Sequence, residues 1–400
     1  MRRRPAHRLW VLLVAALALT LGTGISPASA ADDGPVTTWW ALGGGAAGPM
    51  GDADDDEYCG LVGGGCYRDF QNGTGYWSPA TGAHGVRFAL WEEYYAQGEE
   101  GGRLGYPVAD EGCGKRDGGC SQEFQGGTTL WSPSAGALSV FGALREHYRA
   151  LGWENGPLGY PTGSEQCDEQ LTTCSQWFQR GVGYWSSSTG AHSVRGALFG
   201  EYYALNTMNG VMGLPVTDEA CGKRNGGCSQ EFQGGTLLWS PTSGAHEVRG
   251  ALRGQYRSLG WENGRLGYPI ADEACGKRNG GCSQEFQGGT LLWSPTAGAH
   301  SVLGALRNTY RLTGWENGVL GYPISDEACG KRDGGCSQEF QGGTLLWSPA
   351  TGAAYVTGSF RDQYRSQGWE NGRLGYPVNS PRVDPPRGWV QTFQGGTLRG

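Results

Sequence analysis

CGKRDGGCSQEFQGGTTLWSP, residues 113–133, decides the fold of this chain, because nearly the same letters return from Cys221, Cys275 and Cys329. A second phrase, Leu-Gly-Tyr-Pro, recurs in the same phase, and its variant Met-Gly-Leu-Pro at Met212 fills the one gap. Both phrases repeat every 54 residues. A period of this length indicates stacked or ringed units, none of which can bury its apolar face alone.

Carrying this register along the chain predicts seven units. The first is a worn copy, in which MGDADDDE (residues 50–57) stands where the second unit has LGYPVADE (residues 104–111). The last unit has no cysteines and stops before its Trp-Ser dipeptide. The predicted units start near Gly34, Phe88, Gly142, Gly196, Gly250, Gly304 and Gly358.

Residues 1–30 are predicted to be a secretory signal peptide. Four arginines precede an apolar run from Leu9 to about Leu21, and a small-residue A-x-A ends at Ala30. The run is too short for a membrane span, which needs about 20 apolar residues. We therefore expect cleavage before Ala31 and a single repeat domain over residues 31–400. No later apolar stretch is long enough for an anchor, so we expect the domain to be secreted, extracellular or wall-associated.

The charge balance argues against two classes of partner. The leader holds four of the 31 basic residues, which leaves 27 basic against 38 acidic residues in the mature chain. Nucleic acids and anionic membranes are bound by clustered Lys and Arg, so the sequence predicts binding to neither. The chain has 16 Trp, 18 Tyr and 11 Phe at regular positions, which indicates a folded, turn-rich domain.

Within one unit, GALRGQYRSLGWENG predicts a short helix followed by a corner. Leu252, Tyr256 and Leu259 lie at i, i+4 and i+7, and Asn263-Gly264 is a natural stop. In the Leu-Gly-Tyr-Pro phrase that follows, proline fixes its own φ and pushes the preceding Tyr268 into extended geometry. We expect a rigid corner that places Leu and Tyr in the core.

The cysteines form six pairs, each closing an eight-residue loop. Because the spacing repeats once per unit, pairing within each unit is the simplest framework in a compartment that permits disulfides. A metal site is the alternative, but no His recurs nearby and the C-x-x-C spacing of zinc sites is absent, so we predict no metal. The predicted disulfides join Cys59 to Cys66, Cys113 to Cys120, Cys167 to Cys174, Cys221 to Cys228, Cys275 to Cys282 and Cys329 to Cys336.

After each loop, EFQGGTLLWS predicts a β-hairpin. We place the turn at Gly234-Gly235, which sets Phe232 opposite Leu237, with Trp239 on the same face. This register favours the core over a binding platform as the place for the aromatic series.

The period, the helix, the Leu-Gly-aromatic-Pro corner and the hairpin together resemble the LGFP repeat family of secreted actinobacterial proteins. The resemblance covers essentially the whole mature chain, with Tyr in place of Phe in the phrase at Tyr106, Tyr160, Tyr268, Tyr322 and Tyr376. It implies association with the cell envelope, where such repeats accompany mycolyltransferase and amidase domains. It also implies a tandem-repeat, β-propeller-like ring, each unit a hairpin plus a short helix; an open solenoid is the alternative.

No candidate catalytic site stands clearly apart from the repeat. His147 is the only mature histidine out of phase, and no nucleophile motif lies near it. Asp-Glu pairs such as Asp272-Glu273 could suggest a glycosidase, but adjacent residues on an extended segment point apart. The acidic run from Asp52 to Glu57 lacks the spaced ligands of a known calcium loop, which favours a solvated linker. We predict no catalytic residues and no cofactor.

The remaining candidates are polar residues on the disulfide loops, where long charged side chains are expected to be exposed; solubility alone would explain them equally well. We predict a non-enzymatic module that binds cell-wall polysaccharide through several weak sites. A secreted wall-active hydrolase and a propeller that binds a secreted or envelope protein are the alternatives. The candidate binding residues are Lys115, Arg116, Asp117, Lys223, Arg224, Lys277, Arg278, Lys331, Arg332 and Asp333.

Overall fold

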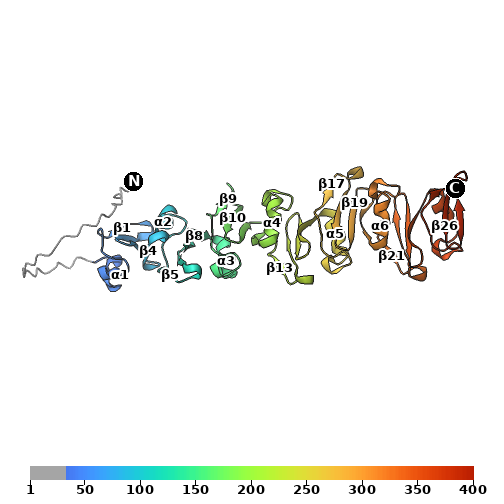
Figure 1. The fold of residues 1–400 in the computed structure, drawn as a ribbon. Coiled ribbons are helices and arrows are strands. Elements are labelled where there is room, and N and C mark those ends of the chain that lie inside the picture. Colours follow the sequence, from blue (N-terminus) through green and yellow to red (C-terminus); the bar gives the residue numbers. More distant parts are fainter. Residues whose placement is uncertain (1–32) are drawn as a thin grey trace, which may run out of the picture.

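The repeat units follow one another in an open row (Figure 1). The computed structural model describes residues 33–400, so the predicted signal peptide lies outside the described residues. The first unit, in blue, and the last, in red, lie at opposite ends, and no ring is formed. The open solenoid, the alternative in our prediction, describes this arrangement.

The way successive units are turned explains why the row does not close. The short disulfide-bearing strands β5 (Gly112–Cys113), β13 (Ala220–Cys221) and β21 (Ala328–Cys329) lie along the lower edge of the row in Figure 1. Strands β9 (Gln166–Cys167) and β17 (Ala274–Cys275) lie along the upper edge. Neighbouring units therefore face opposite sides, so each step advances the row along its axis. Propeller blades would instead stay in one plane.

Each complete unit is a short helix, a 3₁₀ turn, the corner and a four-stranded antiparallel meander. Six such sheets and a final three-stranded sheet occur within residues 33–400. The helices are α1 (Pro35–Leu42), α2 (Phe88–Ala96), α3 (Gly142–Ala150), α4 (Gly196–Ala204), α5 (Gly250–Ser258), α6 (Gly304–Leu312) and α7 (Gly358–Ser366). The 3₁₀ turns that begin with Trp span Trp153–Asn155, Trp261–Asn263, Trp315–Asn317 and Trp369–Asn371.

The strands follow the same period. In the first three units they are β1 (Tyr58–Cys59), β2 (Cys66–Phe70), β3 (Gly73–Ser78), β4 (Gly82–Arg87), β5, β6 (Cys120–Glu123), β7 (Gly127–Ser132), β8 (Gly136–Phe141), β9, β10 (Thr173–Phe178), β11 (Gly181–Ser186) and β12 (Gly190–Arg195). In the fourth and fifth they are β13, β14 (Cys228–Glu231), β15 (Gly235–Ser240), β16 (Gly244–Arg249), β17, β18 (Cys282–Phe286), β19 (Gly289–Ser294) and β20 (Gly298–Leu303). In the last two they are β21, β22 (Cys336–Phe340), β23 (Gly343–Ser348), β24 (Gly352–Thr357), β25 (Arg382–Val383), β26 (Trp389–Phe393) and β27 (Gly396–Arg399).

The helix has the predicted face but ends early. Leu252 and Tyr256 are buried, and Leu259 packs partly buried against the same core. Helix α5 ends at Ser258 rather than at Asn263-Gly264, because Gly260 takes a φ of 89° and turns the chain into the 3₁₀ turn.

The hairpin has the predicted face but a different turn. The Phe232 amide donates to the Gly235 carbonyl at 2.8 Å, and Gln230 lies opposite Leu237. The turn is therefore Gln233-Gly234. Our placement of Phe232 opposite Leu237 is wrong, because the residue opposite Leu237 is Gln230, two positions before Phe232. Phe232 and Leu237 nonetheless lie in one core with Trp239 packed against it, because a shift of two residues keeps the face.

Each hydrophobic core is shared by two units. The core around α5 takes Leu238 and Val248 from the fourth sheet and Leu291 from the fifth. Leu292, the next residue along β19, points into the following core. Both faces of each inner sheet are therefore buried, which is why the strand reads GTLLWS rather than alternating with polar residues.

A buried glutamine ties each pair of neighbouring sheets together. Gln230 Nε2 donates to the Ser193 carbonyl of the preceding unit at 2.9 Å and to the Thr217 carbonyl at 2.7 Å. These bonds satisfy backbone acceptors that the sheets leave open. The same pair of bonds forms at Gln122, Gln176, Gln284, Gln338 and Gln391.

All six predicted disulfides are confirmed, each within its own unit, and no cysteine in the described chain is free. Among residues 33–400, no helix combines the length and the apolar character needed to cross a membrane.

Candidate functional site

The candidate residues lie on the disulfide loops, at the joints between units. In the fourth unit, Lys223 precedes a tight turn, Arg224–Gly226, in which Asn225 has a φ of 55°. Asn or Asp stands at this position in each loop of this kind and tolerates that conformation better than most residues. The equivalent turns are Arg116–Gly118, Arg278–Gly280 and Arg332–Gly334.

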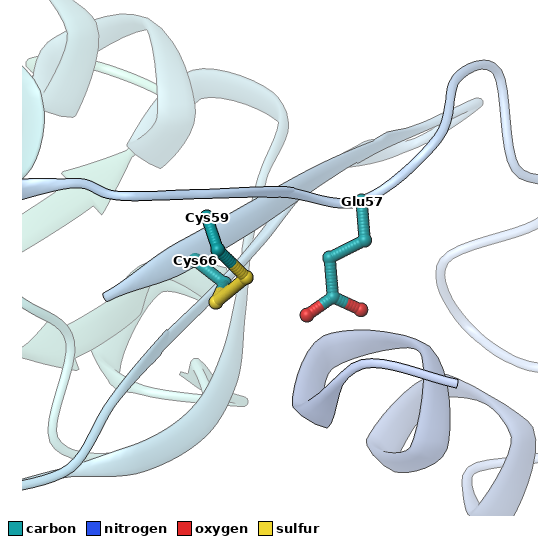
Figure 2. A group of neighbouring side chains, drawn as sticks. All are labelled: Glu57, Cys59 and Cys66. Atoms are coloured by element: carbon teal, nitrogen blue, oxygen red, sulfur yellow. A yellow bond between two sulfur atoms is a disulfide. The ribbon is translucent and has the colours of Figure 1, made fainter. Parts of the chain in front are cut away.

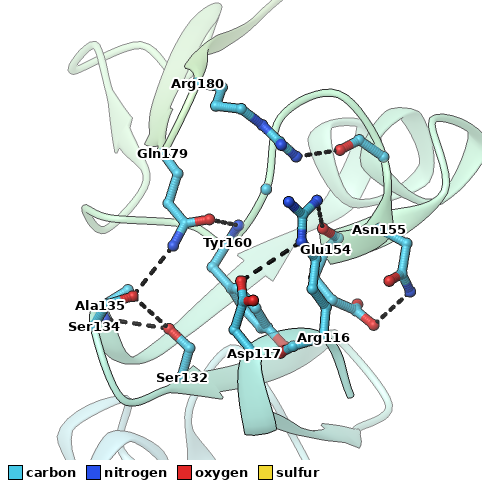
Figure 3. A network of polar contacts seen from close by, with 12 residues as sticks. Arg116, Asp117, Ser132, Ser134, Ala135, Glu154, Asn155, Tyr160, Gln179 and Arg180 are labelled. Carbon is cyan, nitrogen blue, oxygen red and sulfur yellow. Dashed lines mark hydrogen bonds and ion pairs between the residues drawn. The ribbon is translucent and has the colours of Figure 1, made fainter.

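The arginine of each of these loops holds the next unit. Arg224 Nη1 donates to the Glu262 carbonyl at 3.1 Å, and the Arg224 carbonyl accepts the hydroxyl of Tyr268 at 2.7 Å. Figure 3 shows the same exchange between Arg116, Glu154 and Tyr160. These arginines therefore act in the joint, while Lys223 lines a groove.

That groove lies between the fourth sheet and helix α5. It encloses a cavity of about 590 Å³, lined by Lys223 and Glu231 on one side and by Arg253, Trp261 and Glu262 on the other. Glu262 is 6% exposed and accepts a hydrogen bond from Asn263 at 3.3 Å. The groove thus offers a half-buried indole, a buried carboxylate and several donors in one place.

A polar network fixes one wall of the groove. Arg253 donates through Nε to Thr236 at 2.7 Å and through Nη2 to Glu231 at 2.6 Å. The Thr236 hydroxyl donates to the same Glu231 oxygen at 2.8 Å, and the Arg253 guanidinium lies 5.8 Å from the Trp261 ring centre. Both Nε and Nη2 of the Arg253 guanidinium are hydrogen-bonded, so the position of this cation beside the Trp261 ring is fixed.

The Arg-Glu-Thr network occurs at four joints. Sequence reasoning singled out the lysines but missed the Arg, Glu and Trp of the groove, although all of them repeat in phase with Lys. The residues equivalent to Arg253, Glu231 and Thr236 are Arg145, Glu123 and Thr128; Arg307, Glu285 and Thr290; and Arg361, Glu339 and Thr344.

The third unit interrupts this series. Trp177 and Phe199 stand where those four joints have Glu and Arg, and their rings meet edge to face at 5.5 Å. Val182 replaces Thr, and Met208 replaces the buried Glu. Lys is also missing from its loop, CDEQLTTC. The residues that line the groove therefore recur around Lys115, Lys223, Lys277 and Lys331, with an aromatic joint between the first two.

The disulfide loops of the third and fourth units together show how the corner tyrosine and a loop glycine depend on each other. A Cβ atom on Gly227 would lie 2.1 Å from the Tyr268 hydroxyl. In the third loop the residue at this position is Thr173, and the corner residue that would face it is Leu214, which has no hydroxyl. A side chain larger than glycine occurs at this loop position only in the unit whose facing corner residue is not tyrosine. This is expected if the loop side chain and the tyrosine hydroxyl would occupy the same space.

The glutamates of the Asp-Glu pairs form salt bridges with arginines. Glu273 pairs with Arg249 at 3.3 Å, whereas Glu327 pairs with Arg265 at 2.6 Å. The first arginine ends the preceding strand and the second precedes the corner. One unit after Arg249, the equivalent strand position holds Leu303, so Arg265 supplies the positive charge there instead. Each of these two glutamates is thus paired with one arginine at a joint between units.

The acidic residue nearest the first disulfide has a structural partner as well. Glu57 lies beside Cys59 and Cys66 with its carboxylate over helix α1 (Figure 2). Its oxygens accept the amides of Val36 and Thr37 at 3.1 and 2.8 Å, which caps the helix N-terminus. Since both sulfurs are in a disulfide, this group does not offer thiolate ligands to a metal.

His147 also belongs to a joint. Its Nε2 lies 3.4 Å from Asp218 Oδ1, and the ring of His192 lies edge-on to it at 6.3 Å. Gln255 makes the equivalent contact to Asp326 at 2.7 Å. The out-of-phase histidine therefore substitutes for another polar joint residue.

Comparison with known proteins supports the repeat. The family model described as LGFP repeat matches residues 51–102, 104–156, 158–210, 212–264, 266–318 and 320–372. A search of the curated proteins found no match.

Solved structures give only remote likenesses. One is the extracellular domain of a putative hybrid two-component system from B. thetaiotaomicron, at 11% identity over 85% of this chain and 38% of that chain, with a TM-score of 0.14. Another is PorZ, a surface component of the type-IX secretion system of Porphyromonas gingivalis, at 10% identity over 83% and 41% of the two chains and the same TM-score. This chain thus spans less than half the length of either structure.

Proposed function

This chain belongs to the LGFP repeat family, and we propose that it is a non-enzymatic extracellular module that binds cell-wall polysaccharide. The observation that carries the proposal is the recurrence, at four joints of an open row, of the polar and Trp residues that line the groove at Lys223. Shallow sites that combine an aromatic ring with a few fixed polar groups suit sugars, which present both apolar ring faces and hydroxyls. The six disulfides favour an extracellular location.

The row suits a polymer better than a single small ligand. Once one groove holds a polysaccharide, the next groove meets the same chain at high effective concentration. Weak sites then add up without any new contact. The repeat itself therefore supports a polymeric ligand.

The test is co-sedimentation of residues 31–400 with purified wall polysaccharide. We expect saturable binding that weakens in Trp261→Ala and weakens further in Trp261→Ala/Trp315→Ala. Trp177→Ala is the matched control, because this tryptophan is 44% exposed and lies in the joint that lacks the Lys, Glu and Arg of the groove. Equal losses in all three variants, or no sedimentation of the parent protein, would defeat the proposal.

The same samples test the hydrolase alternative. Release of soluble sugar or peptide fragments from the walls over time would show that the chain cuts its ligand, contrary to the non-enzymatic proposal. We expect none, because the histidine and carboxylate candidates described above are bound into joints.

A further inference from the structure

The groove at Lys223 contains two cations that lie outside any salt bridge of the described residues. Arg253 is paired with Glu231, but neither Lys223 nor Arg257 forms a salt bridge with any residue in the described part of the chain. Three cations and the two carboxylates Glu231 and Glu262 line this cavity. The groove therefore carries one excess positive charge.

The other joints differ in this respect. At the Lys277 groove, Lys277 and its helix partner Arg311 are again without a salt bridge within residues 33–400. At the Lys115 groove the equivalent Arg149 pairs with Glu146 at 2.5 Å. At the last groove Lys331 lies 3.5 Å from Glu370. Two neighbouring grooves of the four thus keep both cations available.

We propose that the grooves at Lys223 and Lys277 select sugar residues that carry a negative charge. The ligand class is an acidic polysaccharide, in which a carboxylate or phosphate meets Lys and Arg while the sugar ring lies against Trp. A guanidinium fork matches either anion. This inference rests on the proposed function and adds the charge of the ligand to it.

Local pairing must supply this selectivity, because the chain as a whole is acidic. A polyanion is not drawn to the row by its long-range field, and at physiological salt that field decays within about 8 Å. Ion pairs formed inside a groove, beside a buried wall, are screened less than pairs on an open surface. Neutral polymers should still bind through the indole and the hydroxyl contacts, but more weakly.

The experiment compares polymers that differ only in charge. Residues 31–400 are titrated with polygalacturonate, with its fully methyl-esterified form, and with a phosphomannan and its dephosphorylated form. We expect each charged polymer to bind at least tenfold more tightly than its neutral partner at 0.15 M salt. Comparing the carboxylate and phosphate arms then identifies the preferred anion.

Matched variants locate the effect. Arg257→Ala/Arg311→Ala should abolish most of the preference, because it lowers the affinity for the charged polymer far more than the affinity for the neutral one. Arg149→Ala/Arg387→Ala removes the same net charge, from a paired and from a remote exposed position, and should keep the preference. Equal binding of charged and neutral polymers would overturn this inference while sparing the proposed function. Binding of no polymer at all would overturn both.

Discussion

The dependence between Gly227 and Tyr268 gives a sharp test of how the units are joined. Gly227 has a φ of −75°, which any residue adopts, so backbone strain does not require glycine here. A Cβ atom would instead meet the Tyr268 hydroxyl at 2.1 Å, its ring carbon at 2.5 Å and the Trp239 carbonyl at 2.7 Å. Gly227→Ala is therefore an overpacking change at a buried joint.

The magnitudes follow from the contacts. Overpacking of this kind costs about 1–3 kcal/mol, and we expect Gly227→Ala to fall near 2 kcal/mol. Tyr268→Leu leaves a cavity and an unpaired Arg224 carbonyl, which together cost about 2–4 kcal/mol. In the double variant the tyrosine no longer obstructs the new methyl group. The sum of the costs of the two single variants should therefore exceed the loss measured for the double variant by about 1–2 kcal/mol.

The assay is a double-mutant cycle by guanidinium denaturation, followed by Trp fluorescence and by circular dichroism. Non-coincident transitions would require a fit that treats the units as coupled neighbours. Gly254→Ala is the control, because an added Cβ there meets nothing within 4 Å and the residue lies in helix α5. It should stabilise by up to about 1 kcal/mol.

Tyr268→Phe separates the hydroxyl from the ring. It removes the hydrogen bond but leaves the ring carbon near the new methyl group, so it should relieve Gly227→Ala much less than Tyr268→Leu does. Costs that add within about 0.3–0.5 kcal/mol in the Leu cycle would refute the shared-volume explanation.

Three further outcomes are expected. Gln230→Leu should lower the free energy of unfolding by about 2–3 kcal/mol in denaturation, because it strands the carbonyls of Ser193 and Thr217. Gln233→Leu is its comparison and should cost less, because Gln233 lies at an exposed turn and, among the described residues, its Oε1 accepts only the Leu214 amide, at 2.9 Å. Burial raises the pKa of Glu247, although Arg249 opposes the shift, and Glu201 and Glu273 also face it. The contribution of Glu247 to stability is therefore fully present below the unfolded pKa of Glu, about 4.3, and is lost as pH rises through the higher folded pKa. Glu247→Ser should accordingly be more stable than the parent protein at pH 7 but not at pH 4. A gain in stability that is independent of pH would contradict this. Reduction of the disulfides should cost roughly 2–3 kcal/mol per loop and lower the thermal midpoint, and an unchanged midpoint in reductant would show that the loops add nothing.

Several features of the fold could be read from particular residues. The 54-residue period gave the units, and the fixed spacing of Cys221 and Cys228 gave the disulfide, because a cross-link within one repeat needs only local proximity. The helix face was readable from Leu252 and Tyr256, since a 3.6-residue period depends on nearby residues alone. The hairpin turn was misplaced because Gln233-Gly234-Gly235 offers two adjacent turns, and only the packing of Phe232 on its neighbour selects between them.

The candidate site was only half readable. Lys223 stood out because all four lysines of the chain stand at this one position of the repeat, whereas Trp261 and Arg253 looked like core and helix surface until the next unit was placed beside the loop. No local pattern indicates that the Arg224 guanidinium donates a hydrogen bond to a backbone carbonyl 38 residues away.

The sequence by itself determined what lies within one unit: its length, its helix, its disulfide and its apolar faces, all of which follow from short-range spacing. Tertiary structure alone decided whether the units form a ring or a row, and which side chains meet between them. The reason is that both depend on the rotation from one unit to the next. That rotation is set by many weak contacts across a shared core, such as those of Tyr268 and Gln230, and it accumulates over the whole chain.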